Sequence, residues 1–433
     1  MYYFIGIKGT GMAALAEILF DEGNQVMGSD LDKHFFTEKP LIEKGIKILP
    51  FDPQNIKDNY TVIIGNAFAD DFPEVKAALS NKTVKCYRYH VFLGMMLEKY
   101  ISIGVAGSHG KTTTTGMTKS LLSCYYPTGY LIGDGDGYLA KDSKYFVLEA
   151  DEYRRHFCAY HPDYALVTNV DIDHIDYFKD EADYRSAYDQ FLSQVKKMAF
   201  VNGDDSQARL LKPNSKIVWF GLQPGNDIQA INVKESAEDI SYNVLMNGKD
   251  VGHFSFPFVG HHLVYDSLAV VCFGLELGLT PSEIEAGLST FTGVKRRFVI
   301  EEYHGSIFVD DYAHHPTEVK TTLETARKRW PDKKIVAVFK PHRVSRVKYF
   351  AQQFADALSI ADKVGVCDFT SIDDFEPGIN ITIEYLSSRI KDCKVYQETE
   401  EDAKELALEA PCVYVFMSSK DIYPFKEKVK KYL

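Results

Sequence analysis

The sequence of 433 residues contains few cysteines and no long apolar run, and both absences narrow the class of protein. Its seven cysteines are scattered without a C-x-x-C pair, so neither a disulfide framework nor a zinc site is indicated. No apolar run approaches membrane-spanning length, and Met1 leads into a predicted strand without a signal peptide. The formal net charge of −12 argues against broad nucleic-acid binding, which needs a positive surface. We therefore expect a cytoplasmic protein that binds no nucleic acid and inserts into no membrane.

What the chain does contain is the composition of a soluble globular protein, with 45% apolar and 25% charged residues. Its length predicts two to four domains. Apolar runs alternate with helical stretches along most of the chain, which predicts an α/β fold with three units, residues 1–98, 99–292 and 293–433. Within the second unit, residues 226–259 change to short alternating strands with Gly turns, so we expect an antiparallel insertion there.

The most informative stretch is residues 104–115, GVAGSHGKTTTT, which joins a predicted buried strand (100–105) to a predicted helix (113–124). Val105 stands where the first Gly of the usual phosphate loop belongs, and Gly107 lies close by. A turn of this kind points backbone N–H groups inward, and the helix N-terminus adds partial positive charge. The stretch therefore favours a nucleoside triphosphate over a chance Gly-Lys-Thr sequence.

Three side chains of this turn have the chemistry that a triphosphate needs. Lys111 can reach the terminal phosphates, and the hydroxyl of Thr112 or Thr113 can ligate Mg²⁺.

A second glycine turn lies near the N-terminus, between a predicted strand and a predicted helix. Gly9, Gly11 and Ala14 satisfy the loose dinucleotide fingerprint, and Asp30 lies where a ribose-binding acid is expected. NAD binding is the obvious interpretation of this pattern. The same turn suits any diphosphate, and a purely structural turn is the other alternative.

Polar residues gather after two predicted strands of the second unit. They are Glu149, Asp151 and Glu152 after the strand 145–149, and Asn169, Asp171, Asp173 and His174 after the strand 164–169. Ligands of parallel α/β sheets bind outside the carboxyl ends of the strands, and Mg²⁺ prefers oxygen ligands. The pattern predicts a magnesium site beside the triphosphate. The alternative is that these Asp and Asn residues only form turns.

The third unit repeats this arrangement of polar residues after strands. The strand 306–310 leads into DYAHHP and a helix over 317–329, and the strand 335–339 leads into KPHRVSR and a helix over 349–358. These polar residues predict a further ligand-facing edge. Arg343 and Arg346 have the alternative of lying on a solvated helix face.

Taken together, these stretches resemble the Mur ligases of peptidoglycan synthesis over most of the chain. The resembling stretches are GIKGTGM (6–12), GSHGKTT (107–113), EADE (149–152), TNV and DH (168–174), GVKRRF (293–298), DDYAHHP (310–316) and PHR (341–343). The phosphate loop is shared by all members. DDYAHHP and VKRRF are typical of the alanine-adding branch and its peptide-recycling relative.

The resemblance implies an ATP-dependent ligase that joins L-alanine to UDP-N-acetylmuramate through an acyl phosphate, with ATP and Mg²⁺ as cofactors. Such an activity belongs to cell wall biogenesis and hence to cell shape and cell division. The resemblance further implies a Rossmann-like UDP-sugar domain (1–98), a central phosphate-loop ATP-binding domain (99–292) and a C-terminal Rossmann-like domain (293–433). A monomer or weak dimer is expected.

The resemblance also implies roles for individual residues. The expected catalytic residues are Lys111, His174, His314, His342, Arg343 and Arg346. The expected nucleotide-binding residues are Gly107, His109, Gly110, Lys111, Thr112, Thr113, Asp266, Arg297 and Asp311. The expected substrate-binding residues are Gly9, Thr10, Gly11, Met12, Ser29, Asp30, Asn66 and Tyr312. The expected metal ligands are Thr112, Glu149 and His174.

Three places depart from the family pattern. Asp266 stands where the family has an adenine-reading asparagine, and a carboxylate cannot donate a hydrogen bond to adenine. Residues 418–420, Ser-Ser-Lys, replace a glycine-containing turn, and the segment 368–378 lacks the usual pattern. A degraded glycine turn at 418–420 is the favoured interpretation, and the alternative is that Lys420 binds an anion. The alternative function is a divergent or weakly active paralogue that adds another amino acid or peptide, or that binds nucleotide without catalysis.

Overall fold

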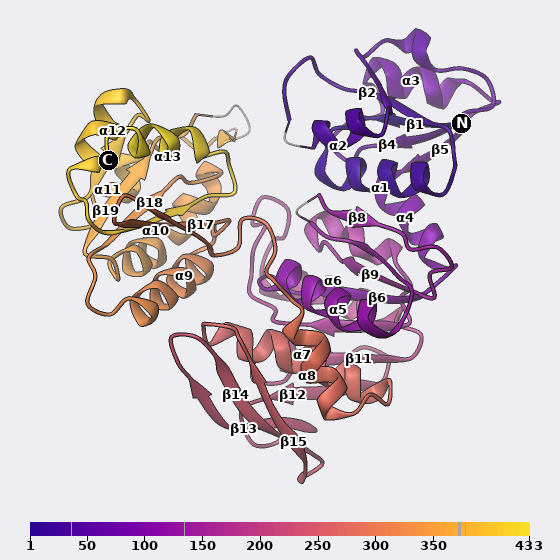
Figure 1. Cartoon of the computed structure of the whole chain (residues 1–433). Coiled ribbons are helices and arrows are strands. Elements are labelled where there is room, and N and C mark those ends of the chain that lie inside the picture. The colour runs from indigo at the N-terminus through magenta and orange to yellow at the C-terminus, as the bar shows by residue number, and fades with distance from the viewer. Residues whose placement is uncertain (36, 134, 371–373, 377) are drawn as a thin grey trace.

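The chain folds into three α/β units, each built around its own sheet (Figure 1). The computed structural model describes residues 1–35, 37–133, 135–370, 374–376 and 378–433. Four residues of the divergent segment 368–378 lie outside these ranges, so the departure there has no structural account. Among the described helices, none is both long enough and apolar enough to cross a membrane.

The first sheet has five parallel strands in the order β3-β2-β1-β4-β5. Its strands are β1 (Tyr2–Ile5), β2 (Val26–Ser29), β3 (Lys47–Leu49), β4 (Thr61–Ile64) and β5 (Lys85–Arg88). Its helices are α1 (Thr10–Asp21), α2 (Glu38–Glu43), α3 (Pro73–Ser80) and α4 (Tyr89–Leu97), with a 3-10 turn η1 (Pro53–Asn55). The apolar run of β1 is buried against α1 on one side and α3 on the other, as a central parallel strand requires.

The second sheet has ten strands in the order β15-β14-β13-β12-β11-β10-β6-β9-β7-β8. Its strands are β6 (Ile101–Ala106), β7 (Thr128–Leu131), β8 (Gly137–Tyr138), β9 (Tyr145–Glu149), β10 (Tyr164–Val167), β11 (Met198–Asn202), β12 (Ile217–Gly221), β13 (Ile228–Glu235), β14 (Ile240–Met246) and β15 (Lys249–Phe256). Its helices are α5 (Lys111–Tyr125), α6 (Glu181–Ser193), α7 (His262–Glu276) and α8 (Pro281–Ser289), with η2 (Tyr153–Ala159) and η3 (Ala208–Leu210).

The antiparallel character predicted for residues 226–259 is confirmed, because β13, β14 and β15 form an antiparallel meander. This meander is continuous with the parallel part of the sheet, since β12 pairs in parallel with β13. The buried strand before the phosphate loop is also confirmed as β6, which lies between β10 and β9. The loops that follow these strands therefore meet at one edge of the sheet.

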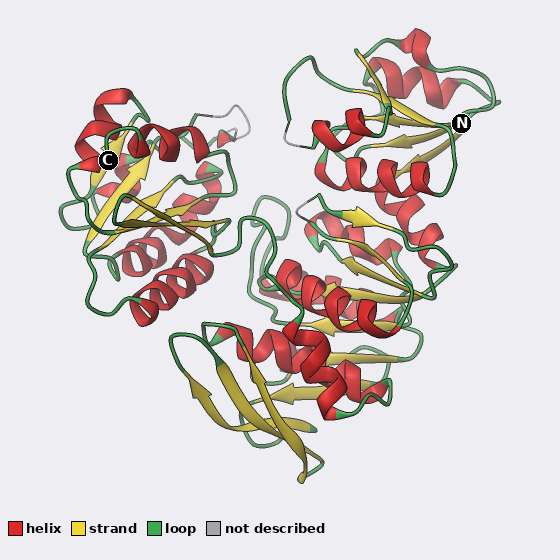
Figure 2. Cartoon of the chain, viewed as in Figure 1, coloured by secondary structure: helices red, strands yellow, loops and turns green. Residues whose placement is uncertain are grey.

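The third sheet has six strands in the order β16-β17-β21-β18-β19-β20, with only the edge strand β16 antiparallel to its neighbour. Its strands are β16 (Val299–Tyr303), β17 (Ser306–Asp311), β18 (Ile335–Phe339), β19 (Lys363–Cys367), β20 (Lys394–Tyr396) and β21 (Val413–Met417). Its helices are α9 (Pro316–Arg329), α10 (Val344–Leu358), α11 (Glu384–Ser387), α12 (Glu400–Ala407) and α13 (Tyr423–Lys430). Figure 2 shows helices on both sides of the first and third sheets.

The predicted start of one helix in this unit is wrong. Helix α10 begins at Val344 instead of Tyr349, so Arg346 lies in its first turn. The backbone leaves helical geometry at Phe350 (φ −107°, ψ 18°), and this kink lies next to the predicted start. The buried side chains of Val344 and Val347 pack into the core, which favours the helix over its first turn.

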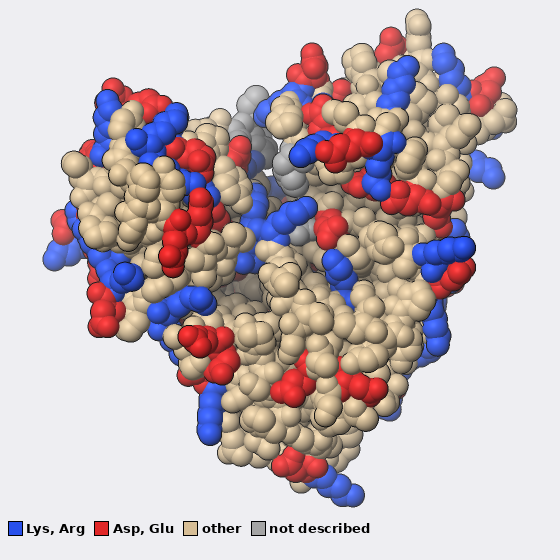
Figure 3. Space-filling view, in the orientation of Figure 1, with Lys and Arg blue, Asp and Glu red and all other residues tan. Residues whose placement is uncertain are grey.

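The units contact one another at several places. Helix α1 of the first unit lies against β8, the outermost strand of the second sheet, where a Cβ on Gly137 would lie 2.8 Å from the Cβ of Ala14. The third unit contacts the loop that follows β10. In Figure 3, Lys and Arg side chains gather at the rim of the hollow between the third unit and the rest of the chain.

Candidate functional site

The phosphate loop joins β6 to α5, and two of its glycines have conformations that other residues resist. Gly107 and Gly110 have φ angles of 141° and 81°. A Cβ on Gly107 would lie 2.0 Å from Oγ1 of Thr168, and one on Gly110 would lie 2.6 Å from Oδ1 of Asp266. Neighbouring side chains therefore fill the space around this turn so closely that only glycine fits.

Lys111 begins α5 and turns its ammonium group back over the loop. Its Nζ lies 2.5 Å from the carbonyl oxygen of Gly107, 3.2 Å from that of Ser108 and 2.9 Å from Oε2 of Glu152. Burial disfavours the charge of Lys111, but the nearby carboxylates, with Glu152 the strongest, outweigh burial and raise its pKa. The loop thus holds a fixed positive charge where phosphate oxygens are expected.

Carboxylates at the ends of neighbouring strands surround this cation, as the pattern of polar residues predicted. The hydroxyl of Thr112 donates to Glu149 at 2.9 Å, and the backbone N–H of Gly133 donates to the same carboxylate at 2.9 Å. Burial raises the pKa of Glu149, although Lys111 opposes this shift. Of the two hydroxyls left open by the sequence, that of Thr112 contacts the carboxylate, whereas Thr113 lines a pocket described below.

A second group of possible metal ligands includes Glu152, the ion-pair partner of Lys111. Ligand atoms of Asp151, Glu152 and His174 all lie within 4.8 Å of one another. Oxygen ligands of this kind, together with the Thr112–Glu149 pair, are the donors that Mg²⁺ prefers. The residues present therefore fit a divalent cation beside the triphosphate.

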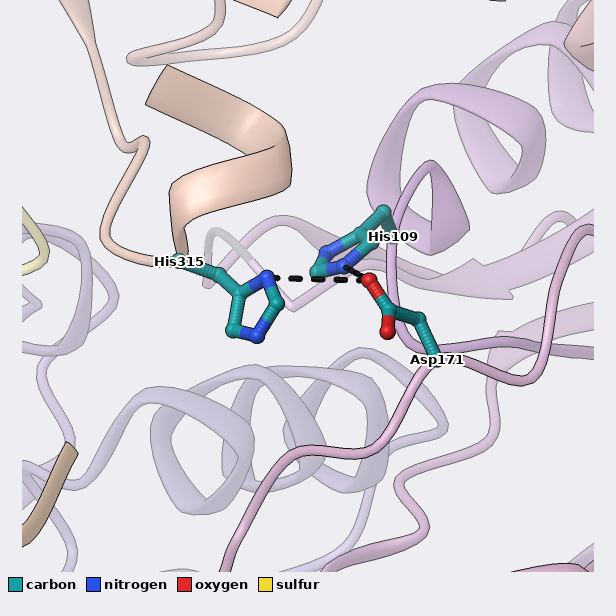
Figure 4. Close-up of side chains that lie close together, drawn as sticks. All are labelled: His109, Asp171 and His315. Atoms are coloured by element: carbon teal, nitrogen blue, oxygen red, sulfur yellow. Dashed lines mark hydrogen bonds and ion pairs between the residues drawn. The ribbon is translucent and has the colours of Figure 1, made fainter. Parts of the chain in front are cut away.

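His109 connects the phosphate loop to the third unit (Figure 4). Its Nε2 lies 3.1 Å from Oδ2 of Asp171, and its Nδ1 lies 3.4 Å from Oε1 of Glu318 on α9. Burial lowers the pKa of His109, but these two carboxylates outweigh burial and raise it to about 9. His109 is therefore an imidazolium at neutral pH, and it adds a second positive charge to the loop.

Figure 4 also shows His315 close to His109 and Asp171, and the positive charge of His109 explains why Asp171 lies beside it. The rings of His109 and His315 lie 4.7 Å apart, and burial lowers the pKa of His315 to about 4. Nδ1 of His315 accepts the backbone N–H of Thr317 at 3.4 Å, so it caps α9. The imidazolium of His109 forms ion pairs, and the imidazole of His315 caps α9. This arrangement does not favour a metal site.

Two arginines of the third unit form ion pairs with the loop after β10. Arg346 donates to Oδ1 of Asp173 at 2.8 Å and 3.1 Å, and both side chains are buried. Arg343 pairs with Asp176 at 2.5 Å. The alternative that both arginines lie on a solvated face is wrong. Their positive charges hold the third unit against the second.

A pocket of about 490 Å³ lies beside the phosphate loop, between the second and third units. Apolar side chains form much of its wall, including Phe258, Leu263 and Phe291. Its lining also includes residues that were expected to bind nucleotide, namely His109, Gly110, Thr113, Asp266, Arg297 and Asp311. The structure thus brings together, in one cavity, residues of two different units that were expected to bind nucleotide.

Two acids of this pocket have raised pKa values because they are buried. Burial raises the pKa of Asp266 to about 8, against the opposing effects of Thr114 and Arg297. Burial likewise raises the pKa of Asp311 to about 6, and its carboxylate accepts from the backbone N–H groups of Phe298 and Ala313. A pKa of about 8 favours the neutral acid form of Asp266 near neutral pH, in place of the carboxylate expected from the sequence.

Glu318 is the residue of this site that the sequence interpretation missed. Its carboxylate lies 3.4 Å from His109, 3.5 Å from Arg297 and 3.1 Å from His314. It also accepts the backbone N–H groups of His314 and His315 at the start of α9. Its place after Pro316 is typical of a helix cap, and this local signal concealed its contacts with the other unit.

The remaining expected residues of the third unit lie around the same edge. His342 approaches Oγ of Ser419 at 3.1 Å. The ring of Tyr312 lies 4.8 Å from the guanidinium of Arg296 and 5.1 Å from that of Arg297. Tyr312 thus lies beside the pocket, between two cations.

The turn at residues 418–420 is ordered by its own side chains. Ser418 is fully buried, and its hydroxyl donates to the carbonyl oxygen of Lys340 at 2.8 Å and accepts from the N–H of Lys420 at 2.9 Å. Arg296 donates to the carbonyl oxygens of Ser418 and Lys420. None of residues 418–420 has a positive φ, so this turn does not require glycine. The geometry therefore disfavours a degraded glycine turn.

The expected residues of the first unit lie on a different sheet from the phosphate loop. Gly9, Thr10, Gly11 and Met12 form the turn into α1 and its first residues. Asp30 accepts from the N–H groups of Lys8 at 2.7 Å and Leu31 at 2.8 Å.

Ser29 and Asn66 have protein partners of their own. The Ser29 hydroxyl donates to the buried Glu74. Asn66 bonds to His90 at 2.8 Å and to His156 at 3.3 Å, and the two imidazole rings stack at 4.6 Å. Substrate binding by these side chains remains a prediction.

Comparisons with known proteins agree with this geometry. Three family profiles match successive parts of the chain: the Mur ligase family catalytic domain over residues 1–101, the Mur ligase middle domain over 105–274, and the Mur ligase glutamate ligase domain over 295–418. The UDP-N-acetylmuramate–L-alanine ligase of Lactiplantibacillus plantarum is 45% identical over 427 residues, which cover 99% of this chain and 97% of that protein.

Two further proteins extend this similarity. The ligase of the same name from Lacticaseibacillus paracasei is 46% identical over 98% of this chain and 97% of its own. Among solved structures, the UDP-N-acetylmuramate–alanine ligase MurC of Thermotoga maritima has a TM-score of 0.83 at 27% identity. That similarity covers 100% of this chain and 98% of the Thermotoga chain.

Proposed function

The chain belongs to the Mur ligase family, and from this premise we propose that it joins L-alanine to UDP-N-acetylmuramate with hydrolysis of ATP. The reaction is an amide-bond-forming step of peptidoglycan precursor synthesis. It proceeds by phosphorylation of the substrate carboxylate and attack of the amino group of alanine on the acyl phosphate. We propose that the enzyme acts in the cytoplasm as a monomer or weak dimer.

The observation that carries this proposal is that the positively charged phosphate loop lies beside the pocket, at one edge of the second sheet. Lys111 and the imidazolium of His109 lie on a glycine turn at a helix N-terminus, beside a pocket lined by two units. Phosphoryl transfer needs positioned positive charge more than covalent help from the protein. The loop provides that charge, and the pocket provides space for the rest of a nucleotide.

We propose that Mg²⁺ binds beside the phosphate loop. Thr112 and Glu149 would hold a cation at the phosphates, and His174 with Asp151 and Glu152 would hold a second one. When bound, the ion would neutralise charge on the transferring phosphoryl group. The protein itself fixes the position of these ligands through the N–H of Gly133 and the ion pair between Lys111 and Glu152.

The first unit is assigned to the UDP-sugar in this proposal. Its glycine turn at Gly9 and Gly11 opens α1, where backbone N–H groups favour a diphosphate. A UDP-sugar replaces NAD as the ligand because the chain belongs to the Mur ligases. His314, His342, Arg343 and Arg346 are proposed to act where substrate and alanine meet, at the contact of the second and third units.

One assay tests the proposed function directly. Phosphate release from ATP is measured with UDP-N-acetylmuramate and each of a panel of amino acids, and then with either substrate omitted. We expect release only when ATP, UDP-N-acetylmuramate and L-alanine are all present. Dependence on a different amino acid indicates the divergent paralogue. Nucleotide binding without release under any condition contradicts a catalytic role.

A further inference from the structure

A buried carboxyl group forms part of the pocket wall beside the phosphate loop. Asp266 lies on α7 with 4% of its surface exposed, and its Oδ1 fits against Gly110. Its Oδ2 is buried and has no hydrogen-bond partner within the described parts of the chain. An unpaired polar atom of this kind costs free energy, so its position next to a ligand pocket calls for a partner from the ligand.

The position of the pocket indicates which part of a nucleotide reaches Asp266. The phosphates belong at Lys111 and the loop amides, and the pocket extends from Gly110 and Thr113 between apolar side chains. The rings of Phe258 and Phe291 contact each other edge to face, with centroids 5.7 Å apart, and their apolar surface in the pocket wall suits a flat heterocycle. A nucleobase is the part of a nucleoside triphosphate with that shape.

We propose that Asp266 binds the nucleobase of ATP as a neutral carboxylic acid, and that its O–H donates a hydrogen bond to a ring nitrogen of the purine. This inference rests on the proposed function, because it takes ATP as the occupant of the pocket. A purine ring nitrogen is an acceptor, so a carboxylate would repel it and a carboxylic acid would bind it. Asp266 is thereby a specificity-determining residue whose donor exists only while it is protonated.

The groups around Asp266 permit its neutral form. Burial is the main cause that raises its pKa to about 8, and the hydroxyl of Thr114 and the guanidinium of Arg297 oppose this shift. His262 has a pKa lowered to about 4 by burial and is uncharged near neutral pH. From the third unit, Glu318 has a pKa well below its ordinary range, and Asp311 has one of about 6, so both are charged above pH 7.

One other group near the pocket changes charge in the alkaline range. His109 has a pKa of about 9 and loses its proton there. The pH dependence of ATP affinity in the wild-type chain alone would therefore combine the titrations of His109 and Asp266. A ratio of affinities between two proteins that both retain His109 isolates the contribution of Asp266.

The first experiment measures binding of ATP with Mg²⁺ by calorimetry at pH 7, 8 and 9, for the wild-type chain and Asp266→Asn. The amide of the introduced asparagine donates at every pH, so this variant serves as the matched control with nearly the same shape. We expect the two proteins to bind ATP similarly at pH 7. At pH 9 about one molecule in eleven keeps a neutral Asp266, so wild-type affinity should fall about tenfold relative to the variant.

Proton uptake offers an independent readout of the same event. At pH 8 about half of the Asp266 groups are ionised, and ATP binding should draw protons onto them. Calorimetry in buffers of different ionisation enthalpy should therefore show uptake of about half a proton more for the wild type than for Asp266→Asn. Equal uptake by the two proteins overturns the proposal.

A second experiment identifies the acceptor and does not depend on pH. The 1-deaza, 3-deaza and 7-deaza analogues of ATP each replace one ring nitrogen with C–H. The wild type at pH 7 should bind one of the three about tenfold more weakly than ATP, whereas Asp266→Ala should not distinguish that analogue from ATP. Thermal unfolding of both variants checks that they fold.

The outcomes separate this inference from the proposed function. If ATP binds but the affinity ratio stays constant from pH 7 to 9, or no analogue is distinguished, Asp266 does not read the base and the ligase assignment stands. If no ATP binds to any of these proteins at any pH, both the inference and the proposed function are overturned.

Discussion

Glu318 of the third unit forms an ion pair with His109 of the phosphate loop, at 3.4 Å across the boundary between two sheets. The pair links the charge of the phosphate loop to the docking of the third unit. Burial alone would lower the pKa of His109, and the shift to about 9 requires Asp171 and Glu318. The loop therefore has its full positive charge only when the third unit is in place.

Glu318→Gln should reduce the positive charge that His109 gives to the phosphate loop. We expect the pKa of His109 to fall from about 9 toward its ordinary value, because one of its two carboxylate partners is lost. ATP affinity at pH 8 should fall about tenfold, the usual effect of losing a hydrogen bond to a charged group. NMR titration of the imidazole and calorimetry measure the two effects. Glu324→Gln, at an exposed site on the same helix, is the control. An unchanged pKa of His109 would show that Asp171 alone holds the proton.

Lys111→Ala should abolish turnover while leaving UDP-N-acetylmuramate binding intact. Lys111 lies on the second sheet, whereas the proposed UDP-sugar turn lies on the first. Loss of a group that stabilises developing charge costs roughly 3–4 kcal/mol in the transition state, or a rate loss of about two to three orders of magnitude. Phosphate release and calorimetry measure the two quantities, with Lys119→Ala on the same helix as the control. A collapse of UDP-sugar affinity would mean that the assignment of units to ligands is wrong.

Asp266→Asn should stabilise the fold increasingly as the pH rises from 5 to 8. Asp266 has a pKa of about 8 in the folded chain and an ordinary value of 3.8. Above pH 4 the unfolded chain releases this proton while the folded chain keeps it, so wild-type stability declines until about pH 8. Asparagine removes that loss, on the order of 3 kcal/mol between pH 5 and 8. Thermal unfolding across this range tests the prediction, and parallel curves for the two proteins would contradict it.

Replacing residues 418–420 with Gly-Ala-Gly should lower stability without raising activity. The Ser418 hydroxyl makes two hydrogen bonds in a fully buried position, and no residue of the turn has a positive φ. Losing these bonds and adding glycine flexibility should cost about 1–2 kcal/mol. The unfolding midpoint and the Michaelis constants for ATP and alanine are the measurements. Higher activity at unchanged stability would restore the interpretation of a degraded glycine turn.

The parts of this molecule that could be predicted from sequence depend on local patterns. The strand β6, the glycine turn and the start of α5 follow from an apolar run, two glycines and a helix without breakers. The contact of Thr112 with Glu149 follows from a general property of parallel sheets, whose strand ends share one edge. These features needed no knowledge of how the three units dock.

The rest depended on burial and on contacts between units, which no local pattern contains. The raised pKa of Asp266 follows from burial within the folded pocket, and the raised pKa of His109 follows in part from a carboxylate that another unit contributes. The arginine pairs with Asp173 and Asp176 likewise join two units. Glu318 looked like an ordinary residue at a helix start, but its carboxylate connects His109, Arg297 and His314.

The close contact of Gly137 with Ala14 has a consequence for solubility. β8 is the last strand of the ten-stranded sheet, and a terminal strand of this kind offers unpaired backbone groups to other chains. Helix α1 lies against β8, and β8 spans only two residues. The first unit therefore shields the second sheet from strand addition by neighbouring molecules. A fragment that begins at residue 99 would expose this end of the sheet and should self-associate.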